Sequence, residues 1–395
     1  MWDGFNKGRL FYMKRRNLAV RECVYLSLAV TIGPMKQTRQ LILSFFLVAL
    51  NLMFSPMASA VQMTQLYQAQ VPVADQGEAE RARAIRSGLG QVLVKVTGNS
   101  QVLSNPEIVQ SLSRAESLIT EYGYVSYNPA NSQDQSGLAL NIHYAQAAVD
   151  RLARSQQLQI WPSDRPELLV WMVVDTLEQG RQFISVDEQP ELLSLLSNAM
   201  KVRAAPLMVP LLDLADRSQL TEEDVWNFSA GQLADVAQRY KTDNWMAVRL
   251  YQSSNGQWRG ARLLKTLDGE DLSSGVADSA AQLINQLVDE AVDRIAGRYA
   301  FIPQTNAQQL TLNVDQVTNF QSFSDVTGYL ESLELVSKLI VDSVEGDRLG
   351  LRLDVEGDFS LLLDTLRRDS RLVEQTTADF PGAGPNEYLF RWHGL

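Results

Sequence analysis

The stretch LVSKLIVDSVEGDRLGLRLDV, residues 335–355, reads as two strands that fold back on each other. Apolar and polar residues alternate along both halves, which is the period of strands with one buried face. Glu345-Gly346-Asp347 lies between the halves and supplies the Gly and Asp that tight turns favour. The stretch therefore predicts a β-hairpin.

Helices and further strands are predicted on both sides of this hairpin. Ser322 with Asp325, and Asp358 further along, carry side chains that cap helix N-termini, and apolar residues follow each at helical spacing. The segments LTLNV (310–314) and EYLFRW (387–392) are read as strands. The resulting order, βαββαβ, predicts a ferredoxin-like module over residues 308–395.

Residues 165–303 form a second predicted module, in which strands alternate with helices. ELLVWMVVD (167–175) is a continuous apolar run, typical of a strand that is covered on both faces, and PLMVPLLDL (206–214) is read as a second one. Asn255-Gly256 is the turn signal of a hairpin, and a long helix is predicted over 276–299. This pattern indicates a mixed α/β sheet.

Residues 61–160 are predicted to form an α+β module. A strand precedes a helix over 78–96, whose apolar residues recur at helical spacing. A second helix is predicted over 106–122, because Pro106 suits a first helical turn, and GLALNIHYA (137–145) alternates as a strand.

Two Pro-containing linkers, WPSDRP (161–166) and YAFIPQTNAQQ (299–309), separate the predicted modules. The predicted fold class is thus α/β and α+β, in three small modules with mixed sheets. The chain is long enough to bury several hydrophobic cores, and it contains no internal repeat or heptad array.

Residues 35–60 have the composition of an export signal. Basic residues precede an apolar run over 41–54, and the small residues Ala58 and Ala60 follow it, which predicts cleavage between Ala60 and Val61. The run is shorter than the roughly 20 residues that a helix needs to cross a bilayer. We therefore expect a periplasmic protein with no stable membrane insertion after cleavage. The alternative is an inner-membrane protein that residues 41–54 anchor.

Residues 1–34 precede this signal and are interpreted as a misassigned start, with translation beginning at Met35, or as an extended n-region. The only cysteine, Cys23, lies there. The sequence has 35 basic and 46 acidic residues; without residues 1–60 it has 27 and 44, a net charge of −17 instead of −11. This charge argues against nucleic acid or an anionic membrane surface as a partner, because both require a basic footprint.

Residues 61–395 contain no recognisable catalytic or metal-binding pattern. His143 and His393 have no G-x-S-x-G turn to act with, and without cysteine they are too few for a zinc site. The acidic turns at 342–347 and 354–358 lack the ligand spacing of a calcium loop. We predict no catalytic residue, no metal and no cofactor. A pair of catalytic carboxylates stays open, because sequence distance does not give their separation in space.

Arg81, Arg83 and Arg86 cluster at the start of the helix predicted over 78–96, in an otherwise acidic chain. Arg83 and Arg86 are one turn apart and share a face, which suits an acidic partner; alternatively, the cluster balances nearby glutamates. Trp161 is the second candidate. Its position in the linker favours either an exposed contact with a partner or a wedge between modules.

Several long motifs resemble those of the proteobacterial envelope proteins catalogued as DUF2066. They are YQAQVPV, LVKVTGN, IWPSDRPELLVWMVVD, PLMVPLLDLADRSQLTEEDVWNF, RYKTDNWMAVRL, GQWRGARL and RIAGRYA. The resemblance covers essentially all of residues 61–395 and implies an envelope address. The family name records an unknown activity, so the resemblance implies no catalytic residue. The predicted middle module also loosely resembles the N-terminal domain of the Tol-system propeller protein.

These observations favour a non-enzymatic binding or assembly factor of the cell envelope, whose partner is an envelope protein or a glycan. The alternative is a hydrolase that acts on envelope material through acidic residues. A deep cleft with two converging carboxylates would favour the hydrolase. A flat or grooved surface with exposed aromatic side chains would favour the binding factor.

Overall fold

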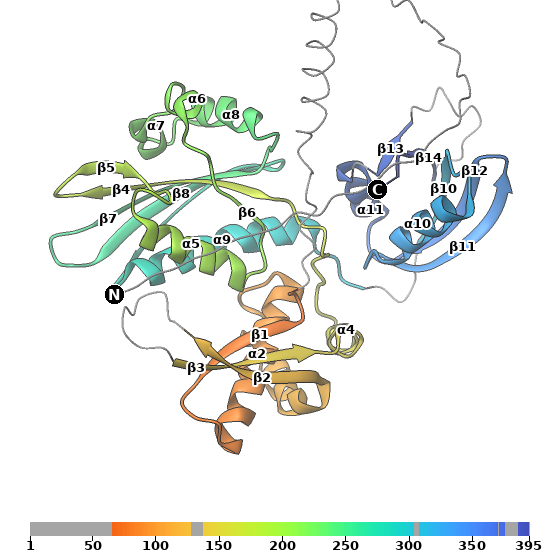
Figure 1. The fold of residues 1–395 in the computed structure, drawn as a ribbon, viewed down its shortest axis with the longest axis horizontal. Helices are drawn as coiled ribbons and strands as arrows, with labels where there is room; N and C mark the ends of the chain where they lie inside the picture. The colour runs from red at the N-terminus through yellow and green to blue at the C-terminus, as the bar shows by residue number, and fades with distance from the viewer. Residues whose placement is uncertain (1–64, 128–136, 304–307, 370, 376–385, 395) are drawn as a thin grey trace, which may run out of the picture. The chain divides into compact units, whose positions relative to one another are not determined.

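The computed structural model describes residues 65–127, 137–303, 308–369, 371–375 and 386–394. They form sheets of three, six and five strands. The sheets belong to an N-terminal module (residues 65–160), a middle module (165–303) and a C-terminal module (308–394), whose elements are labelled in Figure 1. The predicted fold class is confirmed. The predicted signal at 35–60, the cleavage site at Ala60 and Val61 and residues 1–34 lie outside the described residues. None of the helices formed by the described residues combines the length and apolar character that crossing a membrane requires.

The N-terminal module is a three-stranded antiparallel sheet packed against one long helix. The strand order is β1-β3-β2. The elements are β1 (Gln68–Val73), α2 (Glu78–Thr97), α3 (Pro106–Ser111), β2 (Ile119–Tyr127), β3 (Gly137–Tyr144) and α4 (Gln146–Ser155), with 3₁₀ turns at Val102–Ser104 and Leu112–Leu118. The apolar stripe of α2 and the inner faces of β1 and β3 form the core.

The prediction of a helix over 106–122 was wrong for the second half of this range. Only α3 is α-helical; a 3₁₀ turn follows it, and the strand β2 begins at Ile119. The residues from Ile119 to Val125 include β-branched and aromatic side chains, which favour extended backbone, and β2 pairs with β3 along its length. Tertiary pairing therefore overrides the helical start at Pro106.

The middle module has a six-stranded mixed sheet with helices on both faces. The strand order is β5-β4-β7-β8-β9, and β6 pairs with the start of β4. Figure 1 shows α5 and α9 on one side of the sheet and α6, α7 and α8 on the other. The strands are β4 (Leu168–Thr176), β5 (Gly180–Phe183), β6 (Leu207–Met208), β7 (Trp245–Gln252), β8 (Trp258–Thr266) and β9 (Gly269–Ala277). The helices are α5 (Pro190–Val202), α6 (Leu214–Arg217), α7 (Glu222–Trp226), α8 (Ala230–Arg239) and α9 (Ala280–Tyr299).

The central strand β4 is covered on both faces, as its apolar run predicted. Its alternate residues enter two different cores: Leu168, Val170, Met172 and Val174 pack with α5 and α9, whereas Leu169, Trp171 and Val173 pack with α7 and α8. The predicted hairpin at Asn255-Gly256 is also confirmed, because β7 and β8 pair on either side of it.

Two predictions for the middle module were wrong. The strand expected over 206–214 is reduced to β6, because Pro206 and Pro210 have no N–H to donate to a sheet, and Asp213 already caps α6. The helix expected from residue 276 begins at Ala280, and β9 occupies the residues before it. The strand β9 consists mainly of small and polar residues at the edge of the sheet, so it carries a weak apolar signal.

The C-terminal module contains the predicted ferredoxin-like elements and one strand more. The sheet order is β11-β12-β10-β14-β13, and α10 and α11 pack into the same core as the sheet. The elements are β10 (Gln308–Asp315), α10 (Phe320–Glu331), β11 (Val336–Glu345), β12 (Arg348–Val355), α11 (Phe359–Arg368), β13 (Leu372–Glu374) and β14 (Glu387–Trp392). The predicted hairpin of 335–355 is confirmed as β11 and β12.

Two details of this module differ from the prediction. The short strand β13 precedes β14 and reverses the chain, so β14 lies parallel to β10. The cap of α10 is Asn319, one turn before the predicted Ser322, because the Asn319 side chain accepts from the Ser322 N–H and the Ser322 hydroxyl accepts from the Asn319 N–H. Asp358 caps α11 as predicted.

Candidate functional site

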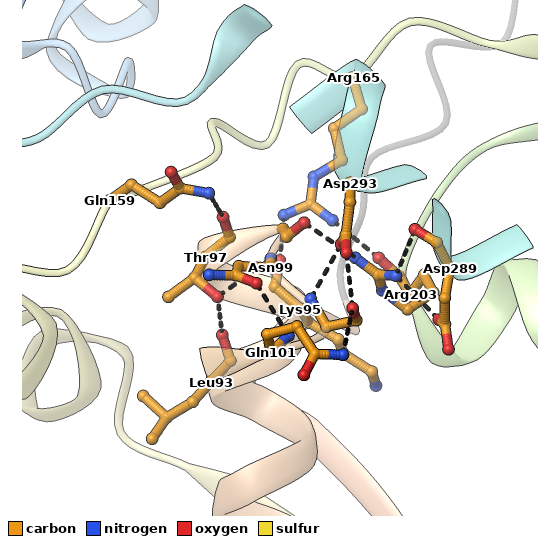
Figure 2. Close-up of polar contacts among 12 residues, drawn as sticks. Leu93, Lys95, Thr97, Asn99, Gln101, Gln159, Arg165, Arg203, Asp289 and Asp293 are labelled. Carbon is orange, nitrogen blue, oxygen red and sulfur yellow. Dashed lines mark hydrogen bonds and ion pairs between the residues drawn. The ribbon is translucent and has the colours of Figure 1, made fainter. Parts of the chain in front are cut away.

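The C-terminal end of α2 is held by groups from outside the helix. The last carbonyl groups of a helix have no partner within it. Figure 2 shows Gln159, Arg165 of the linker and Arg203 after α5 gathered around this end of the helix. The bonds are Lys95 O with Arg165 Nη2 (2.7 Å), Val96 O with the Trp161 N–H (2.8 Å), Thr97 O with Gln159 Nε2 (2.8 Å) and Gly98 O with Arg203 Nη2 (2.8 Å). These contacts form what we call the module junction.

Arg203, the residue after α5, links three helices within the module junction. Its side chain is 2% exposed, and it donates to the carboxylates of Asp289 (2.8 Å) and Asp293 (2.6 Å) on α9 as well as to Gly98 at the end of α2. Ser100, just beyond α2, donates its N–H to the same Asp293 (2.9 Å). The buried cation is thus paired with two carboxylates, which offsets the cost of removing it from water.

Arg165 holds the ends of two helices and forms no hydrogen bond or ion pair with a carboxylate of the described residues. It is buried, and its guanidinium donates only to backbone carbonyls, those of Lys95, Trp161, Pro162, Arg203 and Ala204. Lys95 lies in the last turn of α2, and Arg203 and Ala204 follow α5. A cation is favourable there, because helix C-terminal ends carry partial negative charge.

Trp161 is buried in the module junction and not exposed. Its side chain is 2% exposed and forms part of the core that α5 and α9 share with the sheet. The ring lies against Gly98, and the Arg165 guanidinium stacks 3.9 Å from the ring centroid. Of the two positions predicted for Trp161, the structure shows the buried one, next to α2. The flat ring fits there because Gly98 has no side chain.

The module junction places the end of α5 beside α2 and thereby completes a groove. We call it the apolar groove, and its volume is about 430 Å³. Two of its valines, Val109 of α3 and Val202 of α5, are 50% and 54% exposed. The complete lining is Arg86, Ser87, Gly90, Gln91, Val94, Leu103, Val109, Leu112 and Val202. Exposed aliphatic side chains gathered in a concave surface are typical of a binding site.

Gly90 leaves space within the apolar groove. A Cβ at this position would lie 3.0 Å from Cδ1 of Leu103, closer than ordinary van der Waals contact. Gly90 is in the middle of α2, where glycine is unfavourable compared with alanine by about 0.5–1 kcal/mol. The helix thus has a weaker helix former at the position where a side chain would narrow the groove.

Three arginines that are close in the sequence, Arg81, Arg83 and Arg86, have different contacts in the structure. Arg83 forms an ion pair with Glu80, its Nε donating at 2.9 Å, and this bond holds the pKa of Glu80 at about 2. Arg81 lies over the ring of Tyr122 at 5.9 Å. Only Arg86 lines the apolar groove, and its side chain has no hydrogen bond or ion pair with the described residues.

The apolar groove contains residues that sequence reasoning missed. Ile108 and Val109 are adjacent on the short helix α3, where Ile108 is buried and Val109 is half exposed. Two consecutive aliphatic residues on a surface helix place one of them outside the core, and this was the available signal. Val202 gave no such signal, because its place beside α2 depends on the module junction.

A polar hollow of about 600 Å³ also borders the module junction. Its lining is Ser100, Gln101, Gln282, Asn285, Gln286, Asp289, Glu290 and Asp293. Two of its carboxylates, those of Asp289 and Asp293, form ion pairs with Arg203, so they have a structural role. Within the described part of the chain, no group of three or more His, Cys, Asp or Glu side chains is placed to hold a metal ion.

A match to a family model lies in the part of the chain that forms most of the apolar groove. No curated protein matches the chain. Residues 60–162 match the model of a family described as a domain of unknown function, DUF8605. The matched range contains every residue of the apolar groove except Val202.

Proposed function

We propose that this chain is an exported, non-enzymatic binding or assembly factor of the cell envelope, and that the apolar groove holds its partner. The observation that carries the proposal is the groove itself, in which half-exposed valines lie beside Arg86, which has no hydrogen bond or ion pair with the described residues. Burying such aliphatic side chains against a partner is favourable by about 25 cal/mol per Å² of apolar surface removed from water.

The proposed address rests on the sequence. The basic residues, apolar run and small residues of 35–60 are those of an export signal, and the resemblance to DUF2066 implies the same compartment. Mass spectrometry of the native protein tests it. A mature N-terminus at Val61 is expected; a chain that keeps residues 41–60 would contradict the soluble periplasmic form and support the anchored alternative.

The proposed binding site is tested by photocrosslinking in living cells. A photoreactive amino acid replaces Val109 in the groove, and the same amino acid replaces Arg114, an exposed residue of the same module outside the groove, as the matched control. We expect a reproducible crosslinked product from position 109 and none from position 114. Equal products at both positions, or none at position 109, would overturn the assignment of the groove.

A further inference from the structure

The apolar groove continues into a second hollow, which we call the amide–lysine hollow. Its volume is about 630 Å³, and Gln91 of α2 and Val202 of α5 line both. The remaining lining residues are Gln65, Gln68, Ala69, Gln70, Lys95, Val125, Ser126, Asn141, Asn198 and Lys201. One surface therefore runs from aliphatic side chains at one end to amides and lysines at the other.

The charges along this surface have a single sign. Arg86, Lys95 and Lys201 line it, and the described residues that line the two hollows include no aspartate or glutamate. The sequence as a whole has more acidic than basic residues, 46 against 35. A surface whose described residues include three cations and no acid attracts an anionic ligand and repels a cationic one.

Lys95 is a buried cation that faces the amide–lysine hollow. It is 9% exposed, and its ammonium donates to the backbone carbonyls of Gln68 (2.7 Å) and Gln65 (3.4 Å). An ammonium has three donors, and the described residues accept from two of them, so the third can serve a ligand. Burial lowers the pKa of Lys95 to about 8, so the side chain is still mostly charged at neutral pH. Neither Lys95 nor Lys201 forms an ion pair with the described residues.

The neutral polar residues of the hollow suit a peptide chain. They are mainly side-chain amides, which donate and accept hydrogen bonds as backbone peptide groups do. Among the described residues that line the two hollows there is no aromatic ring of the kind on which sugars stack. The apolar end offers valine and leucine side chains, which suit an aliphatic side chain of a partner.

We propose that the apolar groove and the amide–lysine hollow together bind an acidic peptide segment of a partner protein. An aliphatic side chain of the segment enters the groove beside Val109 and Val202. The segment's backbone passes Gln91, which belongs to both hollows, and its carboxylates approach Arg86, Lys95 and Lys201. This inference rests on the proposed function and adds the chemistry of the partner.

Direct binding to the chain of residues 61–395 tests the inference. The probe is a fluorescent peptide of about nine residues with a central leucine between glutamates, followed by anisotropy. One comparison peptide has lysine in place of glutamate, and a second has serine in place of leucine. We expect the first peptide to bind at least tenfold more tightly than either, and its affinity to fall as salt screens the charges. Equal binding of the lysine peptide would overturn the proposal.

Matched variants locate the site. Lys201→Glu and Val109→Asp, both at exposed positions of the surface, are expected to weaken binding at least tenfold, whereas Lys338→Glu and Val186→Asp, exposed residues of other regions, leave it within about twofold. Thermal unfolding of each variant shows that it is folded. If the variants on the surface and the control variants weakened binding equally, the peptide would bind elsewhere, and this would overturn the proposal.

Competition experiments distinguish an acidic peptide from other anionic ligands. A disaccharide that contains a uronic acid, or vesicles rich in phosphatidylglycerol, should not displace the peptide; displacement by either would overturn the assignment to a peptide. The two proposals also fail differently. Crosslinks at position 109 in cells without a preference for acidic peptides reject only the partner chemistry, whereas acidic peptide binding without crosslinks in cells rejects the proposed function.

Discussion

The Nη2 atom of Arg165 lies 2.7 Å from the carbonyl oxygen of Lys95, and this bond ties the linker to the end of α2. Nη1 of the same guanidinium lies 2.8 Å from the carbonyl oxygen of Ala204, just beyond α5. One side chain thus fixes two helix ends from different modules. The place of Val202 in the apolar groove depends on this connection.

Replacing Arg165 by methionine should destabilise the protein by about 3 kcal/mol or more, because several buried carbonyls lose their donor at once. Arg165→Lys should recover only part of the loss, since an ammonium cannot reproduce the planar fork. Urea denaturation measures both. Arg114→Met, at an exposed residue of the N-terminal module, should change stability by no more than about 0.5 kcal/mol. Similar losses for Arg165→Met and Arg114→Met would contradict the role of the linker.

Gly98→Ala should destabilise the protein by about 2 kcal/mol or more. Gly98 has a φ of +65°, and an added Cβ would lie 2.7 Å from the Trp161 ring and also against Ala296. Gly297→Ala is the matched control, because Gly297 is in α9, is exposed and has open space at its Cβ. That variant should gain up to about 1 kcal/mol. Thermal or urea unfolding that ranks the two variants the other way would reject this account of Gly98.

Gly90→Ala should separate binding from stability. The new methyl gains helix propensity and needs Leu103 to move slightly, so stability should stay within about 1 kcal/mol of the native protein. The apolar groove becomes narrower, and the yield of crosslinks from position 109 should fall. A variant that keeps the full crosslink yield would show that the partner does not use the space beside Gly90.

Lys95 makes stability depend on pH in the alkaline range. Its pKa is about 8 in the folded protein, mainly because of burial and secondarily because of Lys201 and Arg165, and 10.5 is the ordinary value. Between pH 8 and 10 the unfolded chain therefore binds more protons at this residue, so its contribution to stability rises with pH, by about 2 kcal/mol. Urea titrations across this range measure the slope, and Lys95→Met should reduce it. An unchanged slope in the variant would contradict the assignment.

Above pH 10 the trend should reverse. Burial raises the pKa of Tyr67, Tyr144 and Tyr329 well above the ordinary value of 10. The unfolded chain then releases these protons while the folded chain keeps them, so stability falls as pH rises. The free energy of unfolding should pass through a local maximum near pH 10. The tyrosinate absorbance that belongs to these three buried residues, followed alongside unfolding, should increase only as the protein unfolds.

The elements with strong periodic patterns were predictable from the sequence, and those set by pairing were not. The run of 167–175 and the hairpin of 335–355 have patterns long enough to define β4, β11 and β12. The strands β2, β9 and β13 are short of apolar residues or follow a helical start, so only their neighbours in the sheet define them.

Sequence reasoning found one residue of the apolar groove and could not find the groove. Arg86 was a candidate because of its charge, but Arg81 and Arg83 had the same signal and have contacts of their own. Val202 lies far from α2 in the sequence, and the contacts of the module junction, among them the buried bonds of Arg165 and Arg203, place it there. The predictions for Ala60 and Val61 concern residues outside those described, and they stay predictions.

The pairing of β14 with β10 has a consequence for biosynthesis. The strand β10 is central in its sheet, yet one of its two edges is covered only by β14, which is translated after the other long strands of that module. While the chain is still on the ribosome, β10 therefore presents an open edge that other chains can pair with. The C-terminal module should complete its fold only after synthesis has passed Trp392, and chains that stop before β14 should aggregate or be degraded.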